Sequence, residues 1–454
     1  MTPLDEQSFL LFGLGITNVA AARALAEHGL RVALADDREP SPMAAALADE
    51  LGQDIHVGSV GHDLSDLVAS VDAVLPTPGL PERHELFSLA RSSNRPVLSE
   101  FDLAAAWDDR PVLAVTGTNG KTTVTTLVHE MLQASGVTSA AVGNLEVPLV
   151  AAIEDRSIER FVVEASSFRL AHSRRFAPSV GTWLNFAPDH LDVHTSIEAY
   201  RWAKAAIWAH QGPTDVAVVN ADDPVVLAAE PDWSDRPAIV RFALDPTITG
   251  SAPSFHEADG VLVAADGVEL VAVAELHRDL PHDRSNALAA AATALAGGAS
   301  IDGVRTVLRS FGGLPHRVEL VSRIGDVAFY DDSKATAPHA TIAAVRGFPS
   351  VVLIAGGRNK GLDLSGLSEV TAQVRAVVGI GESASEVLAA FGDRPGRVAT
   401  SMGEAVRAAH AMARPGDVVL LSPGCASFDW YGSYGERGDH FRSEVEALVL
   451  EVPT

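Results

Sequence analysis

Cysteine is almost absent from the sequence: Cys425 is the single example in 454 residues. No disulfide framework and no cysteine-based zinc site can therefore form. The sequence also lacks an uninterrupted apolar run of about 18 residues, so we expect no membrane-spanning helix. The first residues carry acids, with no basic stretch ahead of an apolar segment, which argues against a secretory signal. We expect a cytoplasmic protein.

Basic residues are also scarce. Lysine and arginine together number 34 against 59 aspartates and glutamates, which gives a formal net charge of -25 at pH 7. This field repels polyphosphate backbones, so we expect no nucleic-acid partner. A local basic site for a small anion is compatible with the same charge. We therefore expect small-molecule substrates.

Lysine is the scarcest charged residue. Of the 34 basic residues 30 are arginine, and the four lysines are Lys121, Lys204, Lys334 and Lys360. A lysine amine can shift its pKa or react, whereas a guanidinium stays charged and planar. Chance retention explains any single lysine. Four lysines that all fall in candidate site segments are better explained by function.

The length and the alternation of elements define the fold class. The chain is too long for one hydrophobic core and favours two or three domains. Its apolar fraction of 47% excludes wholesale disorder. Apolar runs alternate with helical periodicity, and this β-α-β rhythm predicts α/β domains built on parallel sheets. Polar or glycine-rich segments at 107–111 and 311–315 predict the domain joins.

Short apolar runs locate the expected strands. These are Ser8–Phe12, Arg31–Ala35, Val71–Leu75, Pro111–Thr116, Phe161–Glu164, Val180–Asn185, Asp215–Asn220, Val327–Tyr330, Ser350–Ala355, Ala376–Ile380 and Asp417–Ser422. Helical spacing predicts helices over Thr17–His28, Tyr200–Trp208 and Asn286–Ala296. Residues 237–273 alternate short apolar pieces with glycine and aspartate, which predicts antiparallel strands.

The segment 116–123 (TGTNGKTT) follows an expected strand and opens a helix. Glycines in this position let backbone N–H groups wrap phosphate oxygens, and the helix N-terminus adds partial positive charge. Lys121 would reach the β- and γ-phosphates, and the Thr122 hydroxyl would bind Mg²⁺. The full Walker pattern is not met, because Val115 stands where it has its first glycine. A plain strand-to-helix turn is the alternative.

Carboxylates and an imidazole follow the next expected strands. Glu164 ends one strand, and a segment with Asp189, His190 and Asp192 follows another. Oxygen ligands at the carboxyl ends of parallel strands suit Mg²⁺. Each residue also has an ordinary explanation as a solvated strand end or a plain surface histidine. Lys204 lies in an expected helix with aromatic neighbours and, taken alone, is explained as a lysine lying along an apolar surface.

Two further sets of loops carry candidate ligand groups. Gly13–Asn18 resembles a dinucleotide-binding turn with Asn18 in place of the third glycine, and Asp36 stands about 20 residues on. We interpret it as a general nucleotide-binding turn rather than an NAD(P) site. In the last third, strand-end loops at 331–336, 356–361 and 422–428 would converge on one crevice, and their lysines suit an anionic, carboxylate-bearing ligand.

Together these segments resemble the Mur ligase family. The matching motifs, in chain order, are GTNGKTT, EASSF, NFAPDHLD, AYRWAK, PHRVE, DDSKAT, GGRNKG and SPGCASFD. The last three point to the branch that adds D-glutamate. The resemblance covers the whole chain and implies three domains: a Rossmann-like UDP-substrate-binding domain (1–108), a central P-loop ATP-binding domain (109–314) and a C-terminal Rossmann-like amino-acid-binding domain (315–454).

The resemblance also implies the activity and the nucleotide contacts. The family reaction would join D-glutamate to UDP-N-acetylmuramoyl-L-alanine through an acyl phosphate, with ATP converted to ADP and phosphate, in peptidoglycan synthesis. The UDP substrate would contact Gly15, Ile16, Thr17, Asp36, Arg38, Gly79 and Asn144. ATP would contact Gly117, Thr118, Asn119, Gly120, Lys121, Thr122, Thr123, Asn286, Arg317, Asp332 and Lys334.

The remaining implied residues bind metal and amino acid. Two Mg²⁺ ions would be held by Thr122, Glu164, His190 and a carbamylated Lys204, and the last three with Lys121 would be catalytic. D-glutamate would contact Thr336, Lys360, Ser427, Phe428 and Tyr434. The resemblance further implies a monomer.

The sequence departs from the family pattern at three places. Glu146 stands where glycine is usual, Asp283 where a second asparagine is common, and Thr122 where serine is more frequent. Asp283 puts one adenine contact in doubt. Three alternatives stay open at this point: another amide ligase of the superfamily such as a folylpolyglutamate synthase, a simple P-loop NTPase or GTPase switch, and a non-catalytic nucleotide-binding module.

Overall fold

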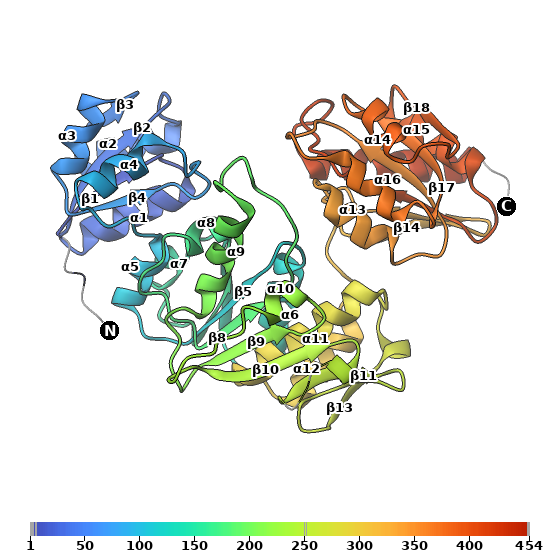
Figure 1. The fold of residues 1–454 in the computed structure, drawn as a ribbon, viewed down its shortest axis with the longest axis horizontal. Helices are drawn as coiled ribbons and strands as arrows, with labels where there is room; N and C mark the ends of the chain where they lie inside the picture. Colours follow the sequence, from blue (N-terminus) through green and yellow to red (C-terminus); the bar gives the residue numbers. More distant parts are fainter. Residues whose placement is uncertain (1–3, 5–6, 249, 251, 452–454) are drawn as a thin grey trace. The chain divides into compact units, whose positions relative to one another are not determined.

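The computed structural model describes residues 4, 7–248, 250 and 252–451. The chain folds as two compact units, one made of residues up to 279 together with 283–311, the other of 280–282 with the residues from 312 onward. The first unit carries two sheets and the second carries one (Figure 1). No helix in the described ranges is long and apolar enough to cross a membrane.

The N-terminal part of the first unit is a four-stranded parallel sheet in the order β3-β2-β1-β4. Its strands are apolar and its core is formed by residues such as Phe9, Leu11 and Leu34. Strand bounds are β1 (Ser8–Phe12), β2 (Arg31–Asp36), β3 (Ile55–Val57) and β4 (Ala73–Pro76). The helices are α1 (Ile16–Glu27), α2 (Pro42–Leu51), α3 (His62–Ala69), α4 (Glu85–Ser92) and α5 (Glu100–Trp107).

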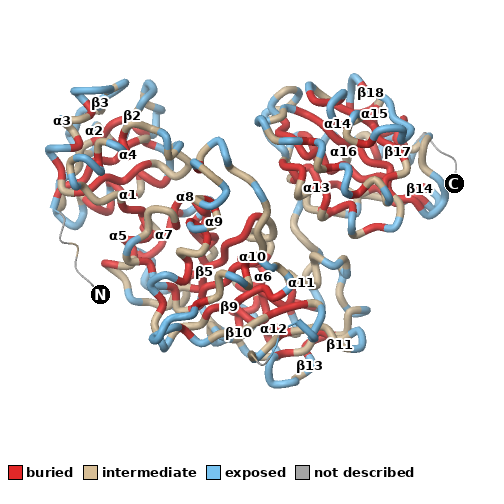
Figure 2. The backbone as a smooth tube through the Cα atoms, viewed as in Figure 1, coloured by how far each residue is buried: buried red, intermediate tan, exposed pale blue. Residues whose placement is uncertain are grey.

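The central sheet has nine strands in the order β13-β12-β11-β10-β9-β8-β5-β7-β6. Alternate residues of its strands belong to two separate apolar clusters, as expected for strands that are buried on both faces. The tube through the sheet is largely buried (Figure 2). The strands are β5 (Val112–Thr116), β6 (Ser139–Gly143), β7 (Arg160–Glu164), β8 (Val180–Trp183), β9 (Val216–Asn220), β10 (Ala238–Ala243), β11 (Ser254–Ala258), β12 (Val261–Val263) and β13 (Glu269–Ala272).

Four helices of this part, α8, α9, α10 and α12, begin with a side-chain cap. The side chain of Ser196, for example, accepts from the backbone N–H of Ala199 at the start of α9. The helices are α6 (Lys121–Ala134), α7 (Leu149–Ala152), α8 (Ser167–Leu170), α9 (Ile197–Ala205), α10 (Pro224–Leu227), α11 (Pro281–Ala296) and α12 (Ile301–Ser310), with short 3₁₀ turns η1 (Ala206–Trp208), η2 (Pro246–Ile248) and η3 (Val273–Glu275).

Two expectations need correction here. Strand β10 pairs in parallel with both β9 and β11, and only β11, β12 and β13 are antiparallel. Between Ala243 and Ser254 the chain returns to the starting end of the sheet instead of reversing in a hairpin, so a parallel pair results. Helix α11 begins at Pro281, ahead of the expected Asn286, because proline is well tolerated in the first helical turn.

The second unit is a six-stranded sheet in the order β14-β15-β19-β16-β17-β18, with β14 antiparallel to β15 and the other pairs parallel. Its strands are β14 (Glu319–Ile324), β15 (Val327–Asp331), β16 (Val351–Gly356), β17 (Val374–Ile380), β18 (Gly396–Val398) and β19 (Val418–Leu421). Its helices are α13 (Pro338–Val345), η4 (Leu364–Val370), α14 (Ala384–Ala390), α15 (Met402–Met412) and α16 (Tyr434–Glu451). The predicted α/β class is confirmed.

Candidate active site

The phosphate loop follows β5 at the middle of the central sheet. Gly117 and Gly120 have φ of +157° and +82°. A Cβ on Gly117 would lie 2.9 Å from Leu184 Cβ, and one on Gly120 would lie 2.6 Å from Asn286 Oδ1. Both glycines are therefore required by conformation and by space. The same contact places Asn286, an expected ATP residue, directly against the loop.

Asn185 fixes the shape of this loop, a role that the sequence did not reveal. Its Oδ1 accepts from the backbone N–H groups of Thr118 and Asn119 at 3.1 and 2.8 Å. The Thr118 hydroxyl donates to Ala187 O and lies 3.2 Å from the Tyr200 hydroxyl. The loop after β8 therefore holds the phosphate loop in place through these contacts.

Two lysines converge on one carbonyl of the phosphate loop. Lys121 Nζ donates to Gly117 O at 2.8 Å, and Lys204 Nζ, on α9, donates to the same oxygen at 2.7 Å. Lys204 is 1% exposed. Burial, together with the charge of Lys121, holds the pKa of Lys204 well below its ordinary value. The lowered pKa makes the neutral, nucleophilic form of the amine more accessible here than in a solvated lysine.

Glu164 ends β7, the neighbour of β5, and is buried. Its Oε1 accepts from Asn144 Nδ2 at 2.9 Å, while its Oε2 is buried without a hydrogen-bond partner among the described residues. A buried carboxylate oxygen in this state is costly unless something else satisfies it. A cation would do so, and this orphaned oxygen fits an expected magnesium ligand.

His190 lies in the loop after β8 with a φ of +55°, a conformation that is uncommon for a residue with a side chain. Its ring contacts the rings of Phe168 and Tyr200 edge-on. Burial and the charges of Lys121 and Lys204 lower the pKa of His190 to about 4. A neutral imidazole is the form that binds a metal ion. The orphaned Glu164 oxygen is the kind of ligand that Mg²⁺ prefers, and Thr122 lies in the first turn of α6; His190 and Lys204 as further ligands stay a prediction.

The expected UDP turn between β1 and α1 is held by its own side chains. Asp36 Oδ2 accepts from Leu14 N at 2.7 Å, and its Oδ1 accepts from Arg38 N at 3.1 Å. Asn18 donates to the carbonyls of Phe12, Gly13 and Leu75. Asn18, which replaces the third glycine, therefore links the turn to the end of β4 by a hydrogen bond. Gly15 and an exposed Ile16 border the turn.

Further contacts join this N-terminal part to the central sheet within the first unit. His194, which is buried, lies 2.7 Å from Glu82 Oε1 through Nδ1 and 2.9 Å from Ser167 Oγ through Nε2. Glu82 Oε2 also accepts from Thr195 N. The loop that contains Gly79 thus lies against the segment that contains His190. Glu82 and His194 carry no local sequence signal, because their pairing depends on tertiary contact.

The three expected loops of the second unit do meet at the carboxyl ends of the strands, because β15, β19 and β16 are neighbours. Gly424 N donates to Ala335 O, and Arg358 and Ala426 exchange backbone hydrogen bonds. Arg437, missed in the sequence, is buried and donates to Ser333 O and Cys425 O. It ties the first loop to the third.

The expected ligand groups of this unit differ in exposure. The ammonium of Lys334 lies 4.9 Å from the centre of the Tyr434 ring. Ser427 is buried, Thr336 is half-buried, and Lys360, Phe428 and Tyr434 are exposed. Arg317 lies close enough to Asp332 for its charge to act on that carboxyl. The assignment of Thr336, Lys360, Ser427, Phe428 and Tyr434 to a carboxylate-bearing ligand stays a prediction.

Asp332 supplies a pH prediction. Burial raises its pKa to about 7, although its carboxyl accepts from Ser422. Because the folded pKa exceeds the unfolded one, the folded state binds the extra proton, and the stability from this group falls as pH rises from about 4 to 7. Asp332→Asn should remove that loss. The melting temperature of Asp332→Asn minus that of the wild type should therefore increase from pH 5 to pH 8. If this difference in melting temperature is the same at both pH values, the prediction is wrong.

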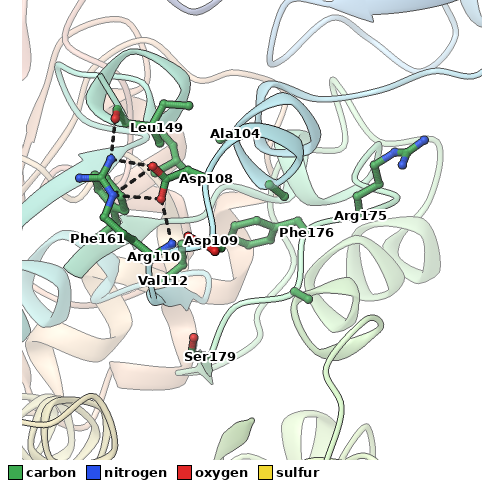
Figure 3. A pocket seen from close by; sticks show the side chains of 13 residues that line it. Ala104, Asp108, Asp109, Arg110, Val112, Leu149, Phe161, Arg175, Phe176 and Ser179 are labelled. Atoms are coloured by element: carbon green, nitrogen blue, oxygen red, sulfur yellow. Dashed lines mark hydrogen bonds and ion pairs between the residues drawn. The ribbon is translucent and has the colours of Figure 1, made fainter. Parts of the chain in front are cut away.

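A cavity of the first unit (Figure 3) lies at the opposite end of the central strands from the phosphate loop. It is lined by residues at the starting ends of β5 and β7, among them Val112 and Phe161, and by the segment that contains Asp108 and Arg110. Arg110 pairs with Asp108 and donates to the backbone oxygens of Asp155 and Ile158. These contacts are structural, and we assign no substrate to this cavity.

Comparison with known families decides the broad identity. Residues 7–99 match the Mur ligase MurD-like N-terminal domain, residues 115–294 the Mur ligase middle domain, and residues 316–425 the Mur ligase glutamate ligase domain. The chain belongs to the Mur ligase family. The resemblance read from the motifs is thereby confirmed. One match falls within each predicted domain, while the boundaries at 108/109 and 314/315 stay a prediction.

Relatives match this Mur ligase along its length. A UDP-N-acetylmuramoylalanine–D-glutamate ligase of Geobacter metallireducens is 37% identical over 98% of both chains. One from Frankia casuarinae is 42% identical over 96% of this chain and 93% of its own. Two solved structures share the fold at 18% identity: a pseudomurein peptide ligase type C from Methanothermus fervidus (TM-score 0.58; 97% and 100% covered) and UDP-N-acetylmuramate-alanine ligase MurC from Thermotoga maritima (0.55; 97% and 99%).

Proposed function

We infer that this Mur ligase adds D-glutamate to UDP-N-acetylmuramoyl-L-alanine, with ATP converted to ADP and phosphate, in peptidoglycan synthesis. The full-length relatives that carry this name support the assignment. The main structural support for the chemistry is that Lys121 and Lys204 both donate to Gly117 O, and that the pKa of Lys204 is lowered. We further propose that the enzyme acts as a monomer in the cytoplasm.

The first step activates a poor acyl donor. A carboxylate oxygen of the UDP substrate attacks the γ-phosphorus of ATP, the bond to the bridging oxygen breaks, and ADP leaves, which gives an acyl phosphate. The phosphate loop from Gly117 to Thr123 would bind the ATP phosphates, with Asn286 beside it. The Lys121 ammonium would neutralise charge that develops on the transferred phosphoryl group. The family resemblance implies that Arg317, Asp332 and Lys334 also contact ATP.

Magnesium would be held by Thr122, Glu164, His190 and Lys204, the last as a carbamate. When bound, Mg²⁺ supplies positive charge that offsets the phosphate oxygens. A carbamate forms when the neutral Lys204 amine attacks CO₂ and loses a proton. It replaces a cationic group by an anion with two oxygens, which suits a hard metal ion. The depressed pKa of Lys204 supports this chemistry.

The second step forms the amide. The neutral amine of D-glutamate attacks the activated carbonyl, phosphate leaves with the acyl C–O bond electrons, and the new ammonium loses a proton. Lys360, Thr336 and Ser427 would bind the carboxylates of D-glutamate, and Phe428 and Tyr434 would border them. The UDP part would lie on the turn formed by Gly15, Ile16 and Thr17, with Asp36, Arg38, Gly79 and Asn144.

Lys360 tests the amino-acid assignment. Lys360→Ala should raise the KM for D-glutamate about 10- to 100-fold, since a charge-assisted hydrogen bond contributes about 1.5–3 kcal/mol. The KM for ATP should change little. Arg346→Ala is the matched control, because Arg346 is an exposed cation of the same unit paired with Glu369. An unchanged D-glutamate KM in Lys360→Ala would remove Lys360 from the site.

A further inference from the structure

Arg169, on α8, joins three parts of the first unit. It is 5% exposed. Its Nη2 donates to Thr17 Oγ1 at 2.9 Å, and its Nη1 donates to Asn144 Oδ1 at 3.0 Å. Thr17 lies in the first turn of α1, and Asn144 follows β6. One planar guanidinium therefore bridges the nucleotide turn and the central sheet.

The chain of hydrogen bonds continues to the metal carboxylate. Asn144 accepts from Arg169 through Oδ1 and donates through Nδ2 to Glu164 Oε1 at 2.9 Å. The other oxygen of Glu164 is the buried one without a hydrogen-bond partner in the described structure. Arg169 thus determines which way the Asn144 amide faces, and the amide determines which Glu164 oxygen stays available to a cation.

A buried ion pair fixes the position of Arg169. Its Nε donates to Glu100 Oε1 at 3.1 Å, and the two side chains are 6% and 1% exposed. Glu100 Oε2 accepts in turn from Val150 N. The guanidinium also lies 5.9 Å from the centre of the Phe101 ring. With these partners the guanidinium cannot shift at one contact without disturbing the others.

We propose that Arg169 is a positioning residue that couples the UDP-binding turn to the metal-binding carboxylate through Thr17, Asn144 and Glu164. The inference rests on the proposed function for the two ends of this chain. A ligand that changes the Thr17 contact changes the restraint on Glu164, and metal binding acts back on the turn, because coupling between binding sites is reciprocal.

Manganese binding to the full-length protein tests the first half of this proposal. Mn²⁺ serves as the probe, measured by its electron spin resonance signal in the presence of a non-hydrolysable ATP analogue and without the UDP substrate. Arg169→Met should weaken Mn²⁺ binding about tenfold or more, the usual effect of losing an outer partner of a metal ligand. Arg169→Lys should not restore Mn²⁺ affinity, because one ammonium cannot reach Glu100, Asn144 and Thr17 at the same time.

Two further variants separate positioning from general damage. Thr17→Val should weaken Mn²⁺ binding severalfold with no UDP substrate present, although its hydroxyl bonds Arg169 rather than the metal site. Arg110→Met is the matched control. Arg110 is also a paired arginine of the first unit, but it contacts Asp108 and backbone carbonyls at the starting ends of the strands, away from Glu164. It should lower the melting temperature and leave the Mn²⁺ affinity unchanged.

The coupling itself is measured by adding UDP-N-acetylmuramoyl-L-alanine. In the wild type it should change the Mn²⁺ affinity by about fivefold or more, and in Arg169→Met by less than about twofold. If Arg169→Met fails to fold because Glu100 is left unpaired, the double variant Arg169→Gln/Glu100→Gln removes both charges and takes its place. The same loss of coupling is expected.

Glu164→Gln distinguishes a failure of the positioning role of Arg169 from a failure of the proposed metal site. If it weakens Mn²⁺ binding while Arg169→Met and Thr17→Val bind Mn²⁺ like the wild type, the positioning role is overturned and the metal site stands. If Glu164→Gln also binds Mn²⁺ normally, the proposed metal site is wrong, and the inference falls with it. Equal weakening in Arg110→Met would show that the effect is general destabilisation, and would also overturn the proposal.

Discussion

Lys204→Ala should be inactive, and short carboxylic acids such as acetate or formate should restore part of its activity. The amine is buried against Gly117 O, and its pKa is depressed by burial and by Lys121. As a carbamate it would present two oxygens to the metal, and a small acid can occupy the same space once the side chain is removed. Activity would be measured as phosphate release against acid concentration.

Lys204→Arg sharpens this test because it keeps the positive charge. It should be inactive and should not respond to acids, since a guanidinium cannot form the carbamate and its volume blocks the added acid. The competing role is an ordinary ammonium that pairs with a substrate phosphate. Activity in Lys204→Arg, or rescue of Lys204→Ala by alkylamines instead of acids, would show that the competing role is correct.

Lys121→Ala should lower kcat by at least about a thousandfold, the upper range for loss of one group that stabilises charge in the transition state. The loop should keep its shape, because Asn185 bonds its backbone and both glycines are required where they are. The melting temperature should therefore stay near that of the wild type.

The control for Lys121 is Arg156→Ala, which removes an exposed arginine of the same unit that pairs with Asp108. It should retain full turnover. If Lys121→Ala keeps wild-type activity, the assignment of the phosphate loop is wrong. If Lys121→Ala is inactive but also melts far below Arg156→Ala, its loss of activity reflects unfolding. The assignment of Lys121 to the phosphate loop then fails as well.

The sequence predicted most elements because local patterns determine them. Buried apolar runs such as Val351–Gly356 and the glycine-bounded loop ahead of Lys121 carry their own signal in the chain. The parallel pairing of β10 with β11 had no such signal. It depends on where the connection between them returns the chain, so the alternating pattern of residues 237–273 predicts antiparallel strands where the structure has a parallel pair.

The candidate site divides in the same way. Lys121, Glu164, His190 and Lys204 can be predicted as candidates from the sequence because each follows a strand or stands out by composition. Asn185, Arg169 and the pair Glu82–His194 act through contacts between segments far apart in the chain. Arginine is so common in this sequence that Arg169 could not be singled out. Only the fold shows that it bonds Thr17, Asn144 and Glu100.

ATP-dependent phosphate release with UDP-N-acetylmuramoyl-L-alanine, scanned across D- and L-amino acids, tests the central claim most directly. The account predicts release that depends on both the nucleotide substrate and D-glutamate, with little response to L-glutamate, and with ADP formed in equal amount. A folylpolyglutamate synthase would prefer L-glutamate and a folate acceptor, and a simple NTPase would release phosphate with neither substrate. Phosphate release that is indifferent to D-glutamate would contradict the account.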